Sequence, residues 1–182
     1  MKRFLFCVFI YCLSPNLYAR SPSEPNSHHL GLGLTGYSFL NDLKEQFGNT
    51  LGYKLTYRYL FPFIEDYKPG IGLSIQYFNA KKNGFDNVNW IITPEISSIV
   101  YDEFVPVGII GGFDINTWSQ SKVYDRREIL HEDILYGMNI GFFTFTSFAP
   151  YGHLQYLLAY HLQQFDTKSS FFELALQYVW DF

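Results

Sequence analysis

Residues 171–182, FFELALQYVWDF, alternate large apolar side chains with smaller or polar ones. A period of two is typical of a β-strand whose two faces meet different surroundings. One face carries the large apolar side chains Phe172, Leu174, Leu176, Tyr178, Trp180 and Phe182. The other face carries Glu173, Ala175, Gln177 and Asp181. The segment therefore predicts a strand between an apolar and a polar environment.

Earlier segments repeat this alternation, so we expect an antiparallel, up-and-down barrel of eight strands. The expected strands are residues 28–39, 50–61, 70–77, 88–96, 105–116, 134–145, 150–162 and 171–182. Most of the connections 39–49, 79–87, 117–133 and 163–170 are longer or more polar than the connections 62–69, 101–104 and 146–149. This asymmetry is typical of transmembrane barrels, which have longer loops at one end and shorter turns at the other.

The volume of the large side chains predicts which face of the strands points inward. An eight-stranded barrel has an interior just wide enough for side chains to fill it, so the many large rings do not all fit inside. The opposite face offers small residues, Gly31, Gly33, Gly52, Gly72, Gly108, Gly112, Gly137, Gly141 and Gly152. We therefore expect a polar, filled interior and an apolar outside. Water would not tolerate such a surface on a monomer, whereas hydrocarbon would, provided that the barrel closes.

Residues 1–19 have the features of a cleaved secretory signal, with basic Lys2 and Arg3 ahead of an apolar run over residues 4–13. We expect residues 20–27 to form a flexible linker and residues 28–182 to form the barrel. Both cysteines, Cys7 and Cys12, fall within the signal, so the mature chain would have no disulfide and no thiolate site. The chain has a formal net charge of −4 and no basic cluster, which argues against binding to nucleic acid.

The last strand resembles the C-terminal strand of bacterial outer-membrane β-barrel proteins. Tyr178, Trp180 and Phe182 stand at the positions of the signal that the barrel-assembly machinery reads in those proteins. In length and pattern, the whole mature chain resembles the small eight-stranded barrels of the OmpA, OmpX and OmpW kind. The resemblance implies a monomer in the outer membrane of a Gram-negative bacterium, in contact with membrane lipid and lipopolysaccharide.

Charged side chains on the inward face predict an interior ionic network, since buried charges must be paired. The network residues are Lys54, Arg58, Glu95, Asp114 and Glu173, and His153, His161 and Asp181 share their face. We expect Arg58 to pair with Glu95 and Lys54 to pair with Glu173. A filled interior of this kind also argues against an open, porin-like channel.

A catalytic alternative is a lipid-A-modifying hydrolase or acyltransferase. By resemblance to outer-membrane enzymes that add or remove acyl chains, it would use His161 with Ser169 or Ser170 and Glu173, around the loop 163–170. Two features argue against it. The deacylase family has a serine two residues after its histidine, where this chain has Gln163, and His161 lies on the inward face.

The sequence predicts no cofactor and no metal site. His28 and His29 are adjacent, so they point to opposite faces of a strand and do not converge on one ion. The cluster of His131, Glu132 and Asp133 falls in an expected outer loop and is interpreted as solvated surface.

The outer loops are the remaining candidates for binding. The expected loop 117–133 carries Trp118, Tyr124, Arg126 and Arg127, and the neighbouring loop carries Lys81 and Lys82. We expect these side chains to contact phosphate groups of lipopolysaccharide or a surface partner. The function favoured is a non-enzymatic barrel with a role in envelope integrity or surface binding. The enzyme is the first alternative, and a secreted, soluble, lipocalin-like ligand-binding barrel is the second.

Overall fold

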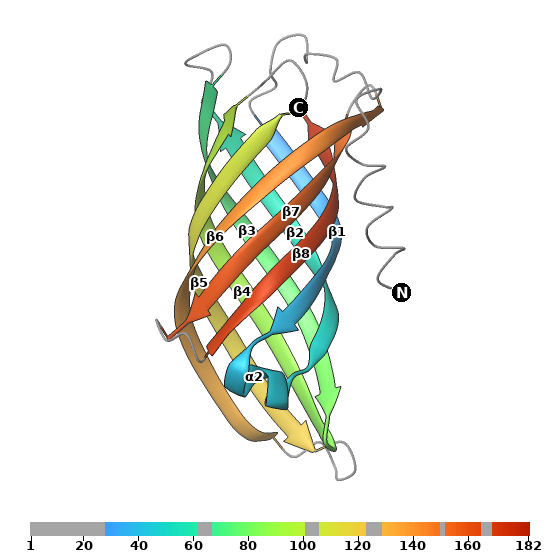
Figure 1. The fold of residues 1–182 in the computed structure, drawn as a ribbon, viewed down its shortest axis with the longest axis vertical. Coiled ribbons are helices and arrows are strands. Elements are labelled where there is room, and N and C mark those ends of the chain that lie inside the picture. The colour runs from blue at the N-terminus through green and yellow to red at the C-terminus, as the bar shows by residue number, and fades with distance from the viewer. Residues whose placement is uncertain (1–27, 62–66, 101–105, 123–128, 150–151, 165–168) are drawn as a thin grey trace.

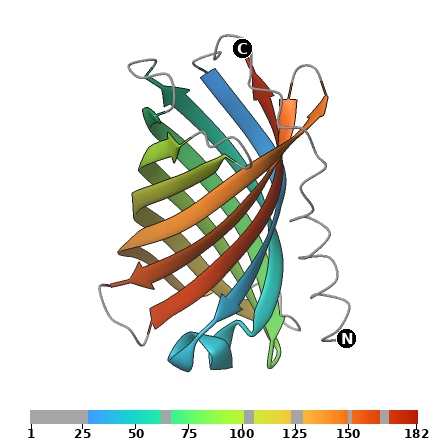
Figure 2. The same ribbon diagram turned by 45° about the horizontal axis from the view of Figure 1, so that its top comes forward.

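In the computed structural model, eight antiparallel strands form a closed barrel in chain order (Figures 1 and 2). The structure describes residues 28–61, 67–100, 106–122, 129–149, 152–164 and 169–182, so the expected signal and linker lie outside the described residues. The strands are β1 His28–Phe39, β2 Asn49–Leu60, β3 Tyr67–Lys82, β4 Phe85–Val100, β5 Val107–Lys122, β6 Ile129–Ala149, β7 Gly152–Gln163 and β8 Ser170–Asp181. The predicted eight-stranded antiparallel barrel is confirmed.

The barrel closes where β1 meets β8. These strands pair without interruption from His29 opposite Asp181 to Phe39 opposite Phe171. Next to this ladder, the backbones of His28 and Phe182 exchange two hydrogen bonds of 3.2 and 3.0 Å. Closure leaves the ladder without a free edge, which is the condition for a sheet to lie in hydrocarbon.

Two of the expected long loops are largely strand, so that part of the prediction was wrong. β3 and β4 continue to a tight turn at Asn83 and Gly84, whose φ angles are 53° and 82°. Positive φ at both central residues is the signature of a two-residue hairpin turn, and Asn-Gly is the preferred sequence for it. β5 and β6 likewise extend to Lys122 and from Ile129. The outward positions of these strand ends are polar, for example Asn79, Lys81, Thr117 and Ser119, so the apolar alternation that marks the other strands is absent from them.

The connection between β1 and β2 contains a short helix, α2 (Asn41–Gln46), where the sequence predicted only a loop. The helix lies at the end of the barrel opposite the C-terminus (Figure 1). Phe47, which follows it, packs on the ring of Phe39 with centroids 5.0 Å apart. Among the described residues, no helix is long and apolar enough to cross a membrane.

The outer face of the barrel is apolar, as the alternation predicted. Leu51 is 77% exposed, Leu34 59% and Ile96 69%, and exposed aromatic and aliphatic side chains continue around the strands. The interior differs from the prediction because it is not lined by small and polar residues alone. Buried apolar groups occupy each end: Tyr37, Phe39, Phe47, Phe78 and Phe171 gather near α2, and Leu60, Ile99, Phe143 and Phe145 form a second cluster.

Gly108 provides a test of how tightly this interior is packed. A Cβ atom there would lie 2.1 Å from Cζ of the buried Phe143 ring, whereas at the outward-facing Gly36 the nearest atom is 3.6 Å away. We expect Gly108→Ala to lower the free energy of unfolding by about 1–3 kcal/mol, the usual effect of overpacking. Gly36→Ala is the matched control and should change it by less than about 0.5 kcal/mol. Urea titration of the detergent-refolded variants measures both, and equal effects would contradict this packing.

Candidate functional site

The middle of the barrel holds six charged or ionisable side chains: Lys54, Arg58, Glu95, Asp114, His161 and Glu173, which we call the central ionic cluster. They come from β2, β4, β5, β7 and β8. All of them are buried, because the alternation of each strand places them on its inward face. Five of the six are the residues that the sequence assigned to an interior network, and the sixth is His161.

Glu173 lies at the centre of this cluster. Lys54 Nζ donates to both of its carboxylate oxygens, at 2.8 and 3.0 Å. The Thr35 hydroxyl donates to Oε1 at 3.2 Å, and His161 Nε2 lies 2.9 Å from Oε2. The structure therefore pairs Lys54 with Glu173 from the two strands that flank β1, β2 and β8, rather than across the lumen, and adds His161 as a third charged group to this contact.

His161 joins Glu173 to a second carboxylate. Its Nδ1 lies 2.6 Å from Asp114 Oδ2, while its Nε2 faces Glu173. A doubly protonated imidazolium donates from both nitrogens and so satisfies both contacts. With His161 in this form, the central ionic cluster contains three positive and three negative groups. The imidazole ring also stacks on Phe171, with centroids 4.4 Å apart.

Asp114 receives further hydrogen bonds from neutral side chains. Thr93 Oγ1 and Asn139 Nδ2 donate to its Oδ1 at 2.7 and 2.6 Å, and Gln163 Nε2 donates to Oδ2 at 3.3 Å. The sequence analysis did not assign these three donors to the interior network. All three occupy inward positions of their strands, so strand alternation was the signal that would have found them.

Arg58 and Glu95 form the other part of the central ionic cluster. Arg58 Nε and Nη2 donate to Glu95 Oε1 at 3.1 and 2.7 Å, and Nη1 donates to Gln155 at 3.2 Å. The guanidinium carbon lies 4.6 Å from the centre of the Phe143 ring, a cation–π contact. Gln155 donates in turn to Gln177, which donates to Thr56. Both of the ion pairs expected from the sequence are thus present in the geometry.

The catalytic alternative is not assembled in this arrangement. His161 is 1% exposed, and both of its nitrogens face carboxylates rather than Ser169 or Ser170. Glu173 is engaged by Lys54 as well as by His161. A general base needs its nucleophile within hydrogen-bond distance. Here both nitrogens of His161 instead contact the carboxylates of Asp114 and Glu173.

At the α2 end, which the sequence predicts to face outward and which we therefore call the outer rim, the predicted binding residues do not form one group. Trp118 is half-buried and belongs to the aromatic cluster, with its ring 6.0 Å from Phe47 and its Nε1 3.4 Å from Asn87 Oδ1. It is a packing residue rather than part of an open loop. Lys81 is exposed, and Lys82 donates to the carbonyl of Lys44 in α2. Tyr124, Arg126 and Arg127 lie outside the described residues.

The expected assembly-signal residues lie on the outer surface beside the seam between β1 and β8. Trp180 and Phe182 are exposed, and Tyr178 is half-buried against the Trp180 ring at 4.7 Å. Phe182 stacks on the ring of His28 with centroids 5.7 Å apart. The inward Asp181 instead lies between His29 and His153.

Known structures provide an independent comparison of the fold. One match is Ail, the attachment invasion locus protein of Yersinia pestis, in a structure with the heparin analogue sucrose octasulfate. The TM-score is 0.61 and the sequence identity is 13%, and the match covers 85% of this chain and 97% of Ail. Neisserial surface protein A matches with a TM-score of 0.59 and 12% identity, and the match covers 88% of this chain and 100% of that protein's chain. This chain has the fold of the small outer-membrane β-barrels. The expected resemblance of the whole chain to the small eight-stranded outer-membrane barrels is thereby confirmed at the level of the fold.

The same comparison does not select a role. The outer-membrane enzyme PagL also matches, with a TM-score of 0.52 and 10% identity over 85% of this chain and 99% of that one. No model of a protein family matches the sequence, and a search of curated proteins gave no match. A function therefore has to be argued from the side chains of this chain.

The Arg58–Glu95 pair predicts a coupled effect on stability. Arg58→Leu leaves Glu95 buried without its partner and should cost about 3–5 kcal/mol of unfolding free energy. Replacing both residues by leucine removes both charges and should cost less than the sum of the single changes. Glu132→Gln, which alters an exposed carboxylate, is the control. Additive losses in urea titrations would show that the two side chains are not coupled.

Proposed function

We propose that this protein is a sealed, non-enzymatic barrel of the bacterial outer membrane. A cleaved signal at residues 1–19 directs its export, and it is a monomer that holds the outer rim outside the membrane. There the rim binds phosphate groups of lipopolysaccharide. The observation that carries this proposal is an interior filled by paired charges inside a wall whose outward face is apolar.

The outer wall supports insertion in lipid. Its exposed rows include Leu34, Leu51, Ile96, Ile140 and Leu174, each more than half exposed. A soluble monomer rarely exposes an apolar surface that continues around the whole molecule. A closed antiparallel ladder meets the other requirement of hydrocarbon, that backbone groups be satisfied within the protein.

The interior supports a sealed barrel rather than a pore or a ligand carrier. Arg58, Lys54 and His161 extend into the lumen and bond to carboxylates of other strands. The cavity next to α2 has a volume of about 40 Å³, which suits a few water molecules but falls far below the roughly 300–1,000 Å³ of small-molecule sites. This filling weighs against the lipocalin-like alternative.

The geometry also weighs against lipid-A chemistry at the site that the sequence offered. His161 is bound between two carboxylates within the barrel, whereas a lipid substrate would approach from the outer wall. Its engagement with Glu173 and Asp114 gives it a structural role in the central ionic cluster.

The outer rim carries the chemistry for phosphate. Lys44 and Lys81 are exposed there, and Lys82 bridges the β3–β4 hairpin to the C-terminal end of α2. Lysine ammonium groups bind phosphate as point charges. Because Lys82 supports α2, the exposed Lys44 and Lys81 are the pair to test for binding. The three outward aromatic residues of the seam, Tyr178, Trp180 and Phe182, serve recognition by the barrel-assembly machinery in this proposal.

A vesicle experiment tests the proposal. Barrels reconstituted into vesicles that contain lipopolysaccharide should leave small-solute permeation at the level of empty vesicles and leave the acyl chains of lipid A unchanged by mass analysis.

Lys44→Gln/Lys81→Gln should bind less lipopolysaccharide than the wild type at low salt. Glu132→Gln, which removes a negative charge from the same end of the barrel, should not reduce binding. Solute leakage would contradict the sealed barrel, a change in acylation would favour the enzyme, and unchanged binding by the lysine variant would contradict the rim site.

A further inference from the structure

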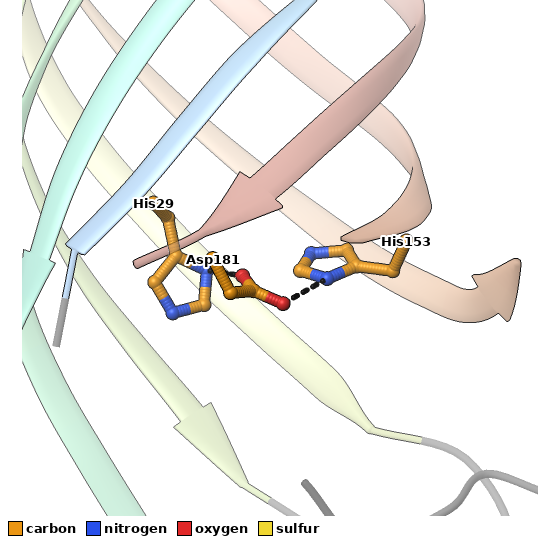
Figure 3. A group of neighbouring side chains, drawn as sticks. All are labelled: His29, His153 and Asp181. Atoms are coloured by element: carbon orange, nitrogen blue, oxygen red, sulfur yellow. Dashed lines mark hydrogen bonds and ion pairs between the residues drawn. The ribbon is translucent and has the colours of Figure 1, made fainter. Parts of the chain in front are cut away.

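Three inward side chains meet at the end of the barrel opposite α2: His29 of β1, His153 of β7 and Asp181 of β8 (Figure 3). One ligand atom from each residue lies within 4.8 Å of the others. The central ionic cluster does not include this group, and the proposed function does not use it. The sequence analysis considered His29 only with its neighbour His28, and the residues that join it come from strands more than a hundred positions away in the sequence.

Strand register brings the three residues together. His29 is directly opposite Asp181 in the β1–β8 ladder, so their side chains leave neighbouring backbones on the same face. His153 is opposite Val179, two positions before Asp181, and therefore reaches Asp181 diagonally across the β7–β8 ladder. Since three adjacent strands supply one residue each, the backbone of the closed barrel preorganises the group.

The contacts have the spacing of metal ligands. Nδ1 of His29 lies 3.1 Å from Asp181 Oδ1, and Nδ1 of His153 lies 3.2 Å from Oδ2. In a tetrahedral site with bonds of about 2.0 Å, neighbouring ligand atoms are about 3.3 Å apart. A metal ion between the two imidazoles and the carboxylate would draw together ligand atoms that already lie within 4.8 Å of one another.

Hydrogen bonding does not fully account for the arrangement. Asp181 Oδ1 is buried and has no hydrogen-bond partner, so its 3.1 Å contact with His29 lacks the geometry of a hydrogen bond. Two ligand atoms of one metal ion face the ion rather than each other. The contact between His29 Nδ1 and Asp181 Oδ1, which is close but not aligned as a hydrogen bond, has this arrangement. His153 is 5% exposed, and its Nε2 has no partner either. The group thus includes buried polar atoms that the protein leaves unsatisfied.

The surroundings permit a cation. Arg58 is opposite His29 in the β1–β2 ladder, but its guanidinium turns to Glu95 and Gln155. Phe145 covers one side of His153, with ring centroids 4.4 Å apart, and gives the site an apolar wall. The side chain of Asp181 remains 26% exposed, which leaves a route for an ion to enter.

We propose that His29, His153 and Asp181 bind a divalent transition-metal ion of the zinc class. Two imidazoles and one carboxylate suit zinc and its neighbours, whereas calcium and magnesium require mainly oxygen ligands. Three protein ligands leave one coordination position for water. Because the ligands come from β7, β8 and β1, the bound ion ties together the strands on both sides of the closure between the first and last strands.

The test uses the folded, chelator-treated protein in detergent, with Zn²⁺ followed by calorimetry and Co²⁺ followed by visible absorption. We expect one equivalent of Zn²⁺ to bind, four-coordinate Co²⁺ bands to appear and the thermal unfolding temperature to rise with Zn²⁺. His153→Gln and Asp181→Asn should each weaken binding by about 100-fold or more. His28→Ala is the matched control, because His28 precedes His29 but contacts Tyr57 and Phe182 outside the barrel.

Two results would overturn the proposal. One is the absence of saturable Zn²⁺ binding by the folded wild-type protein. The other is equal binding by wild type and Asp181→Asn, which would place the ion elsewhere, for example at the exposed Glu132 and Asp133. Asp181→Asn keeps the size of a partly exposed side chain, so it gives a folded variant for this comparison if His153→Gln does not fold.

Discussion

The contact on which the rest of this structure depends is the one between His161 and Glu173. Through it, Lys54, Glu173, His161 and Asp114 form one continuous series of charged groups from β2 across β8 and β7 to β5. A buried charge without a partner would cost several kcal/mol, so each member requires the next. Two of its contacts, Lys54–Glu173 and His161–Asp114, join strands that do not pair directly, and the β1–β8 ladder completes the closure.

The need to pair these buried charges has consequences for the inward and the outward face of the barrel. Because the lumen is occupied by long charged and amide side chains, the inward face needs small residues between them, as at Gly72, where a Cβ atom would lie 3.1 Å from Glu95 Oε1. Large side chains are then displaced to the outward face, where only hydrocarbon accommodates them. In the proposed function, this interior provides cohesion and blocks passage, and binding is left to the two ends. The lysines beside α2 occupy one end, and the two histidines with Asp181 occupy the other.

Much of this arrangement is predictable from the sequence, because a period of two assigns every residue of a strand to a face. That rule alone assigns Lys54, Arg58, Glu95, Asp114, His161 and Glu173 to one interior. It fails where the outward positions become polar, so the strand extensions near Lys82 and Lys122 were expected to be loops. It also does not predict α2, or Trp118 packing on Phe47, because those depend on how a six-residue helix lies over the barrel end. The group of His29, His153 and Asp181 requires the register between strands, which alternation does not provide.

The central claim is that the chain closes into a barrel with its charges inside and its apolar residues toward lipid. Gel mobility in SDS, compared between unheated and boiled samples of the detergent-refolded protein, tests it most directly. A closed barrel keeps its ladder in cold SDS and should run at a different position until it is boiled. Identical mobility before and after boiling, for a protein that is also soluble in detergent-free buffer, would contradict the account.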